Sequence, residues 1–315
     1  MRVPPIALAL IFLTAAPAKA DLLKQSEWLP KGTIVTDLTE RPVEYLDNGA
    51  EQSFLVHFGR LAFRSPLILG GNARRAGLSC NSCHTSGHRN DRFFVPGLSD
   101  EPGKVDVTHM LWNPRNDDRK PNPRAIPTLR GVGEKRWLGR DERVSSLREF
   151  TRHVIVVEFA GAEPSPLLLD ALLAYMRVVA PKESGEDPDV EAVRLEGDIE
   201  DISLHLATLR QPLLEEDGPL AALIIEMIRG EIGLIHERFH MPAHALARRL
   251  LEGWSMALKD LAAGARPGQF PAARAKLDEL QKRIAADTPQ LLGAEATSLY
   301  SPDVVRKALE GQSRR

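Results

Sequence analysis

Cysteine is almost absent from this chain, which has only two in 315 residues. This count excludes a fold held together by several disulfides, and it leaves no thiols for the second cysteine knuckle of a structural zinc site. Aromatic residues make up only 5% of the chain. The net charge is −2 and no long run of one sign occurs, so neither nucleic acid nor an anionic membrane is an expected partner.

The composition is otherwise that of a globular protein, with 43% hydrophobic and 27% charged residues. At this length we expect about two domains. Apolar residues recur at helical spacing in most segments, so the expected fold class is mainly α.

The N-terminus has the pattern of an export signal. Arg2 supplies a positive charge, residues 6–16 form a short apolar run, and Ala18-Lys19-Ala20 has small residues where signal peptidase reads them. We expect residues 1–20 to be a signal peptide that is removed before Asp21, which predicts a periplasmic protein. A membrane-spanning helix needs about 20 apolar residues, so no stable span is expected after cleavage. An uncleaved anchor is the alternative.

Both cysteines belong to one short motif, Cys80-Asn81-Ser82-Cys83-His84. This C-x-x-C-H arrangement is typical of c-type haem attachment, in which two thiols add to the vinyl groups of one haem and the histidine ligates the iron. We therefore predict one covalent haem c, held by Cys80 and Cys83, with His84 as proximal iron ligand. Two other interpretations stay open: a redox-active disulfide, and part of a zinc site that includes His88.

The motif lies inside a predicted domain at residues 50–182. Residues 21–49 precede it and are interpreted as an extended N-terminal arm, with one short strand at 33–36. Helical periodicity is found at 49–63, 145–159 and 167–179. The region 85–127 is long and rich in Gly, Pro, Asn and Asp. A loop of this length suits a compact domain if it wraps a large ligand such as haem.

Several segments of this domain occur in the order found in one known family. They are Leu69–His84, Ile126–Arg130, Gly139–Asp141, Ser146–Phe150 and Leu172–Met176. The stretch resembles one cytochrome c-type domain of the bacterial dihaem cytochrome c peroxidase and MauG family. Members of that family carry two haems on two such domains, each with its own C-x-x-C-H. The resemblance therefore implies a single-haem relative, without the second haem that stores or relays an electron.

The ligand on the far side of the iron would decide between electron transfer and catalysis. His153 lies where one domain of the family places a methionine ligand, although the matched position is Val154, one residue later. Met110 in the wrapping loop is the other main candidate for this distal ligand, and His109 beside it is a third.

Two further residues are candidates for catalysis. The peroxidatic domain of the family carries an acid/base glutamate near this segment, which Glu158 resembles with a shifted spacing. The alternative for Glu158 is a capping or salt-bridged residue at a helix end. Arg140 has two interpretations, as a partner of a haem propionate or as a member of a surface ion pair.

The C-terminal domain, residues 183–315, is predicted to be an antiparallel helical bundle. Four amphipathic segments are expected, at 190–210, 219–239, 243–263 and 271–286. Their expected boundaries are Pro212, Gly218, Pro242 and residues 264–271. We expect this bundle to serve as a docking surface for a partner protein.

Three histidines of the bundle, His236, His240 and His244, recur at i, i+4 and i+8. On one unbroken helix they could bind a transition metal or a second, non-covalent haem. Because Pro242 falls inside the stripe and interrupts the helix, we favour a solvated face instead.

These observations predict a periplasmic c-type cytochrome with one covalent haem c, acting in electron transfer with a redox partner protein. The alternative is a cytochrome c peroxidase-like oxidoreductase that reduces hydrogen peroxide or oxidises a partner, with Glu158 and Arg140 as catalytic residues. A third possibility is a haem-based sensor or assembly partner that acts through the bundle.

Overall fold

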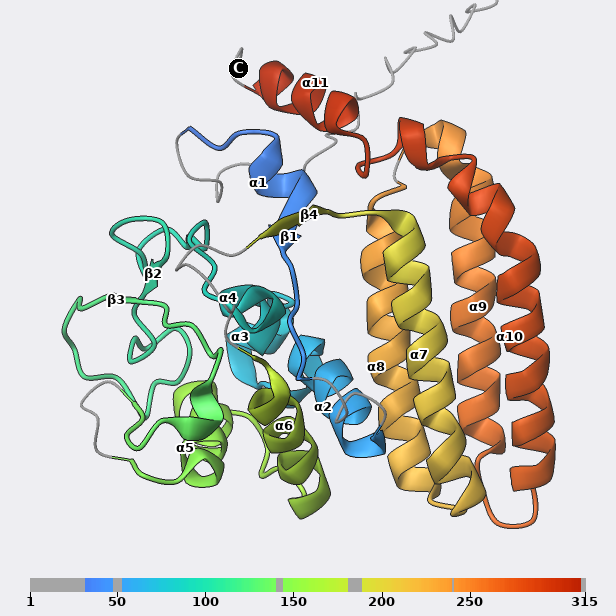
Figure 1. Cartoon of the computed structure of the whole chain (residues 1–315), viewed down its shortest axis with the longest axis horizontal. Helices are drawn as coiled ribbons and strands as arrows, with labels where there is room; N and C mark the ends of the chain where they lie inside the picture. Colours follow the sequence, from blue (N-terminus) through green and yellow to red (C-terminus); the bar gives the residue numbers. More distant parts are fainter. Residues whose placement is uncertain (1–31, 48–52, 140–143, 181–188, 240, 313–315) are drawn as a thin grey trace, which may run out of the picture.

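The computed structural model describes residues 32–47, 53–139, 144–180, 189–239 and 241–312. Helices make up most of these residues and the strands are two or three residues long, which confirms the mainly α prediction. Figure 1 shows two parts side by side, a loop-rich part that contains helices α2 to α6 and a bundle formed by α7 to α10.

Two crossed helices form the centre of the loop-rich part, α2 (Phe54–Arg64) and α6 (Pro166–Val178). Ser53 and Ser165 cap their N-termini, each through a side-chain oxygen that accepts a backbone N–H at 3.2 Å. The helices approach so closely that a Cβ on Gly59 would lie 1.9 Å from the carbonyl oxygen of Ala171. Only glycine is small enough at this crossing.

Short elements surround the crossing. They are η2 (Pro66–Ile68), α3 (Gly71–Arg75), α4 (Cys80–Cys83), η3 (Thr85–Gly87), β2 (Lys104–Val105), β3 (Arg124–Ala125) and η4 (Val132–Glu134). The region 85–127 is therefore mostly irregular, as predicted. Its buried Asp106 organises it, because the carboxylate accepts the backbone N–H groups of Thr108 at 3.0 Å and Asn122 at 3.2 Å.

The predicted helix at 145–159 is present but changes type half-way. α5 (Leu147–His153) begins at Ser146, whose side chain accepts the Glu149 N–H at 3.2 Å. It continues directly as a π-helix, η5 (Val154–Glu158), closed by a hydrogen bond of 3.1 Å from Phe159 N–H to the Val154 carbonyl. A π-turn holds one residue more than an α-turn, so it shifts every later side chain around the axis.

The described part of the arm runs along the first domain. The strand predicted at 33–36 is wrong, because Asp37 accepts the Ile34 N–H at 2.9 Å and the chain turns into a short helix, α1 (Thr36–Thr39). The strand β1 (Glu40–Pro42) follows and pairs antiparallel with β4 (Val190–Ala192), with Glu40 opposite Ala192.

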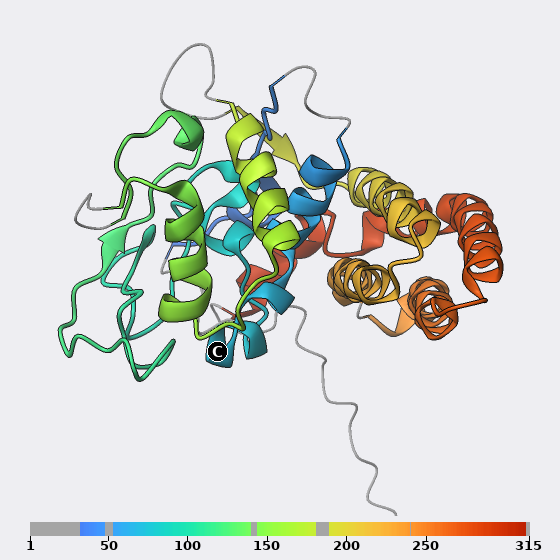
Figure 2. The ribbon, with the colours of Figure 1, turned by 90° about the horizontal axis from the view of Figure 1, so that it is seen from below.

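The bundle consists of α7 (Leu195–Leu214), α8 (Gly218–Glu237), α9 (Ala245–Gly264) and α10 (Phe270–Leu292). Each helix packs on the next and α10 returns to α7, so the four close a ring that Figure 2 shows end-on. The prediction of Pro212 as a boundary is wrong, since it lies in the last turn of α7 and the helix ends at Leu214. The short η6 (Pro242–His244) and η7 (Glu295–Thr297) and the last helix, α11 (Pro302–Gln312), complete the fold.

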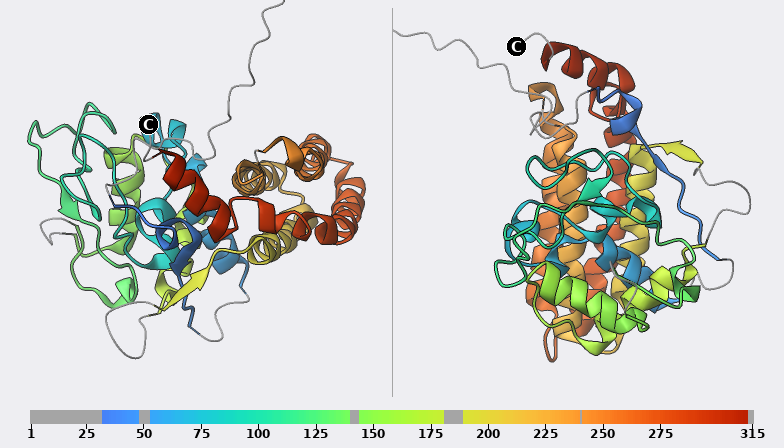
Figure 3. Two further views of the ribbon diagram at one scale, coloured as in Figure 1. Left: turned by 90° about the horizontal axis from the view of Figure 1, so that it is seen from above. Right: turned by 90° about the vertical axis from the view of Figure 1, so that its left-hand side faces the viewer.

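The two parts share one continuous core of buried side chains. Helix α2 makes the junction, because it contacts α6 on one side and α7 and α8 on the other. The views from above and from the side in Figure 3 show the loops of the first part on the surface remote from the bundle. The loops of the first part therefore lie on the side of the molecule that faces away from the bundle (Figure 3).

Candidate functional site

The two cysteines occupy one turn of helix, α4, which begins after Ser79. The Ser79 N–H donates to the Ser82 hydroxyl at 3.0 Å, and the His84 N–H donates to the Cys80 carbonyl at 2.8 Å. After His84 the chain turns sharply at Ser86, whose φ of 53° is rare for a residue other than glycine. The Asn81 side chain stabilises this turn by accepting the Ser86 N–H at 2.9 Å.

Cys80 and Cys83 carry free thiols and are partly buried among apolar side chains. Burial raises the pKa of each thiol to about 12, and the neighbouring Cys80 contributes to the raised pKa of Cys83. Redox-active C-x-x-C pairs have thiols with lowered pKa values, near 7 or below. This pair has the opposite property, which weighs against a redox-active disulfide.

His84 is held by one hydrogen bond, 2.9 Å long, from its Nδ1 to the Pro127 carbonyl. A carbonyl only accepts, so Nδ1 carries the proton and Nε2 keeps its lone pair. Burial and the charge of Lys135 together lower the pKa of this imidazole to about 4, against its hydrogen bond to the Pro127 carbonyl, which raises it. His84 is therefore neutral at pH 7, in the tautomer that can bind a metal ion through Nε2.

Cys80, Cys83 and His84 fit the donor set that a covalently bound haem requires: two free thiols on one turn and a neutral imidazole with a fixed ring. The zinc interpretation has less support. His88 lies near His84 in sequence, but its Nδ1 is paired at 3.1 Å with the Thr128 hydroxyl. Among the residues that the structure describes, no group of three or more His, Cys, Asp or Glu side chains could hold a metal ion.

Arg130 was identified in the sequence only as the end of the segment Ile126–Arg130, and the structure gives it a defined place. Its Nη2 donates to the Val43 carbonyl at 2.6 Å, and its guanidinium lies 5.1 Å from the centre of the Tyr45 ring. Burial lowers its pKa. Its buried Nε–H has no hydrogen-bond acceptor within the described ranges, so one donor is left available.

His153 and Glu158 are brought together by the π-helix. The His153 Nε2 lies 4.0 Å from the Glu158 Oε1, and the side chain of Glu158 is only 15% exposed against 48% for His153. In an α-helix, side chains five residues apart point in different directions, whereas the i to i+5 bonding of a π-turn stacks them. Glu158 is thus a shielded carboxylate at a helix end, next to the imidazole of His153.

Met110 and His109 lie in the loop that precedes Trp112. Met110 is 56% exposed, and the His109 Nδ1 accepts the Leu111 N–H at 3.1 Å. The loop is attached to the π-helix, because the Asn113 side chain donates to the Val157 carbonyl at 2.6 Å and the Trp112 and Phe159 rings are 5.7 Å apart.

The segment that leads into the C-x-x-C-H turn joins these two groups of candidates. The Gly70 N–H donates to the Phe159 carbonyl at 3.1 Å, and the Asn72 side chain donates to the Leu111 carbonyl at 2.7 Å. A Cβ on Gly70 would lie 1.9 Å from the Ala160 carbonyl oxygen, so the contact requires glycine. The wrapping loop and the π-helix therefore both pack against the start of α3, a few residues before Cys80.

The remaining predicted residues either lie apart from one another or fall outside the residues that the structure describes. Arg140, His240 and the signal peptide at 1–20 are outside the described residues. His236 lies at the end of α8, with its Nε2 3.2 Å from Glu252 Oε1. The solvated face proposed for His244 is wrong, because this residue is buried and its Nε2 pairs with the Thr297 hydroxyl at 3.0 Å. Pro242 interrupts the helix as predicted.

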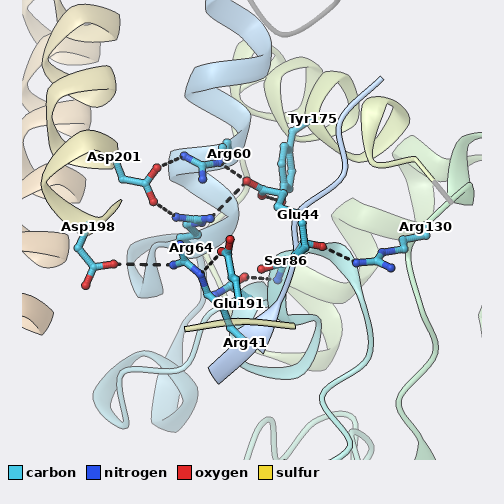
Figure 4. A network of polar contacts seen from close by, with 12 residues as sticks. Arg41, Glu44, Arg60, Arg64, Ser86, Arg130, Tyr175, Glu191, Asp198 and Asp201 are labelled. Carbon is cyan, nitrogen blue, oxygen red and sulfur yellow. Dashed lines mark hydrogen bonds and ion pairs between the residues drawn. The ribbon is translucent and has the colours of Figure 1, made fainter. Parts of the chain in front are cut away.

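Sequence reasoning missed a buried charge network at the junction of the two parts (Figure 4). Arg60 and Arg64 of α2 lie between Glu44 of the arm and Asp201 of α7. The Arg60 Nε is 2.6 Å from Glu44 Oε2, and the Arg64 Nη1 is 2.5 Å from Asp201 Oδ2. Tyr175 of α6 donates its hydroxyl to Glu44. Two arginines four residues apart on an otherwise apolar helix face were the available signal.

Electrostatics differ across this network. Burial alone would raise the pKa of Asp201, but the charges of Arg64 and Arg60 lower it below its usual range. Nearby on α8, burial raises the pKa of Glu231 to about 7. Burial also lowers the pKa of His205 to about 3, so this imidazole is neutral. The network carries two cations and two carboxylates, and it fastens the arm, the crossed helices and the bundle together.

Comparison with known proteins gave no match, because no family model, curated protein or solved structure is significantly similar to this chain. In the part of the chain that the structure describes, no helix is both long enough and apolar enough to cross a membrane.

Proposed function

We propose that this chain is an exported c-type cytochrome that carries one covalent haem c and transfers electrons to or from a partner protein. The observation that carries the proposal is the state of His84, a neutral imidazole fixed through Nδ1 to the Pro127 carbonyl and next to two free thiols. A hydrogen bond of this kind orients a ligating ring and makes its other nitrogen more basic. Haem would supply one-electron chemistry as its iron alternates between ferric and ferrous states.

The residues of the chain have distinct tasks in this proposal. Cys80 and Cys83 would hold the cofactor through thioether bonds, and His84 would ligate its iron through Nε2. The buried Nε–H of Arg130 is a donor for a carboxylate such as a haem propionate. Arg140 is proposed for the same task as an alternative. Met110 or His153 is proposed as the distal ligand, because both lie on segments that pack against the start of α3.

The proposed family is that of the bacterial dihaem cytochrome c peroxidases and MauG, of which this chain would be a single-haem relative. The α2–α6 crossing and the capped α5 support a cytochrome c-type domain at about residues 50–182. A periplasmic location follows from the proposed signal peptide at 1–20. The bundle at 183–315 would support the haem domain and could dock a partner.

Covalent attachment is the first property to test. The full chain is produced in cells that mature c-type cytochromes and is then denatured. We expect the haem to stay with the denatured wild-type chain and to leave the Cys80→Ala/Cys83→Ala double variant. Haem that separates from the denatured wild-type protein would refute the proposal, whatever its native spectrum shows.

The distal ligand is tested by visible absorption spectra of the ferric and ferrous protein. A six-coordinate, low-spin iron that does not bind carbon monoxide is expected of an electron carrier. Met110→Ala and His153→Ala are compared singly, and the variant that turns the iron high-spin identifies the ligand. If neither does, the distal ligand lies elsewhere in the chain.

A second candidate function is a cytochrome c peroxidase-like oxidoreductase. The shielded carboxylate of Glu158, 4.0 Å from His153 Nε2, favours it, since a pair of this kind can move a proton during peroxide cleavage. Glu158→Gln should then reduce peroxide turnover by about 10² to 10⁴-fold. Glu163→Gln is the matched control, because Glu163 is exposed and paired with Arg152. Equal turnover in these two variants would exclude this role for Glu158.

A further inference from the structure

The segment that follows η4 exposes an aromatic ring and two cations together. Lys135, Arg136 and Trp137 all lie on the surface, and the Trp137 side chain is 46% exposed. The Arg136 guanidinium lies 5.5 Å from the centre of the Trp137 ring. Tryptophan and arginine are the residue types most enriched at energetically important positions of protein interfaces. An exposed pair of this kind therefore indicates a contact surface.

This segment lies next to the proposed proximal ligand. The Lys135 Nζ donates to the Thr128 carbonyl at 3.4 Å, and Thr128 follows Pro127, whose carbonyl holds His84. The positive charge of Lys135 also contributes to the lowered pKa of His84. A protein bound to this surface would thus sit one chain segment away from the iron ligand.

The local charge is positive. Arg177 of α6 adds a third exposed cation, because its Cγ would be 3.1 Å from a Cβ on Gly133, just before the segment. No ion pair to Lys135, Arg136 or Arg177 exists among the residues that the structure describes. Glu134, the last residue of η4, is an exposed acidic residue directly before the segment.

The two domains carry opposite charge. Residues 50–182 contain 20 basic and 14 acidic residues, a net charge of +6, whereas residues 183–315 contain 16 basic and 23 acidic residues, a net charge of −7. An acidic partner is therefore attracted to the haem domain and repelled by the bundle.

We propose that Lys135, Arg136, Trp137 and Arg177 form the surface on which an acidic electron-transfer protein docks to exchange an electron with the haem. This proposal rests on the proposed function and names its partner by charge. It moves the expected docking site from the bundle to the haem domain. The cations steer the partner, and the Trp137 ring supplies the apolar contact at the centre of the interface.

Stopped-flow oxidation of the reduced, haem-loaded full chain tests the electrostatic part. The oxidants are ferricyanide, an acidic plastocyanin and the cationic tris(phenanthroline)cobalt(III) ion. At low ionic strength, Lys135→Glu/Arg136→Glu should lower the rate of oxidation by the two anionic oxidants on the order of tenfold and raise the rate with the cationic one. The control, Lys259→Glu/Lys276→Glu, changes net charge equally on exposed positions of α9 and α10 and should alter each rate less than twofold.

Trp137→Ala tests the contact itself. It should lower the rate of oxidation by plastocyanin at least threefold and keep the rate with ferricyanide within twofold, because a small ion makes no use of an apolar contact. Equal effects of the two charge-reversal variants, or an unchanged plastocyanin rate in Trp137→Ala, would overturn the docking surface while ferricyanide oxidation still supports the proposed function. A chain without covalent haem would overturn the proposed function first, and this surface with it.

Discussion

The close crossing of α2 and α6 makes a testable prediction in which one substitution has opposite effects at two positions. Gly59 and Gly230 both lie inside long helices, and replacing a helical glycine with alanine stabilises by about 1 kcal/mol through helix propensity alone. Around Gly230 nothing lies within 4 Å of the added Cβ. Gly230→Ala should therefore raise the free energy of unfolding by about 1 kcal/mol.

Gly59→Ala should instead lower the free energy of unfolding. Its Cβ would lie 1.9 Å from the Ala171 carbonyl oxygen and 2.9 Å from the Tyr175 Cβ, whereas real Cβ contacts are essentially never under 3.0 Å. The obstacle is backbone and cannot rotate away, so the two helices must separate by about 1 Å and lose packing such as the Phe63–Tyr175 contact at 5.1 Å. Overpacking costs about 3 kcal/mol at the upper end of its usual range, which leaves a net loss of about 2 kcal/mol after the propensity gain.

The assay is guanidinium unfolding followed by far-ultraviolet circular dichroism, with thermal unfolding as a second measurement. An unfolding entropy of about 2.1 cal/mol/K per residue converts about 2 kcal/mol at this chain length to a decrease in Tm of about 3 °C for Gly59→Ala, and Gly230→Ala should gain about 1.5 °C. A Gly59→Ala protein as stable as Gly230→Ala would refute the reasoning, because the helices could not then be in backbone contact at residue 59.

Three further predictions concern the junction and the proposed ligand. Asp201→Asn should lower the free energy of unfolding by about 3–5 kcal/mol at pH 7, since Arg64 is left buried with one partner fewer. The folded-state pKa of Asp201 is lowered, so the difference between variant and wild type should shrink as pH falls below about 3.8. Urea unfolding at pH 7 and pH 3 measures this change. Glu231 has a folded-state pKa raised to about 7 from 4.5, so the unfolding free energy of the wild type should fall by on the order of 3 kcal/mol as pH rises between these values. Glu231→Gln should remove this loss and be the more stable protein at pH 8 but not at pH 4.5. Equal pH profiles of the two proteins would show that this carboxyl is solvated. His84→Gly should keep its haem through both thioethers, and added imidazole should restore the wild-type visible spectrum; a variant spectrum identical to wild type without imidazole would exclude His84 as the proximal ligand.

Local signals predicted much of this fold. The helices of the bundle follow from apolar periodicity, and a helix start at 145 or 146 follows from a hydroxyl three residues before Glu149; the structure places the cap at Ser146. Pro242 interrupts the helical structure between α8 and α9 because it cannot donate a backbone hydrogen bond. These features depend on neighbours within one or two turns, which a sequence displays directly.

Features that depend on distant partners could not be predicted in the same way. Arg60 meets Asp201 across 141 positions, and nothing near either residue encodes the other. The π-turn at 154–158 has the same apolar pattern as an α-helix, so apolar periodicity does not distinguish the two. Of the candidate site, the motif and its histidine followed from spacing, whereas the Pro127 contact required the fold.

The N-terminal arm can take its place in the fold only after its partner segments have been synthesised. β1 pairs with β4 about 150 positions later, and α1 lies against α11, the last helix described. During synthesis from the N-terminus, the arm must therefore wait for its partners while the cysteine turn at 80–83 has already been made. Until then β1 cannot take its place against η3, the turn directly after the cysteines, so this side of the cysteine turn is covered only once the rest of the chain has been made.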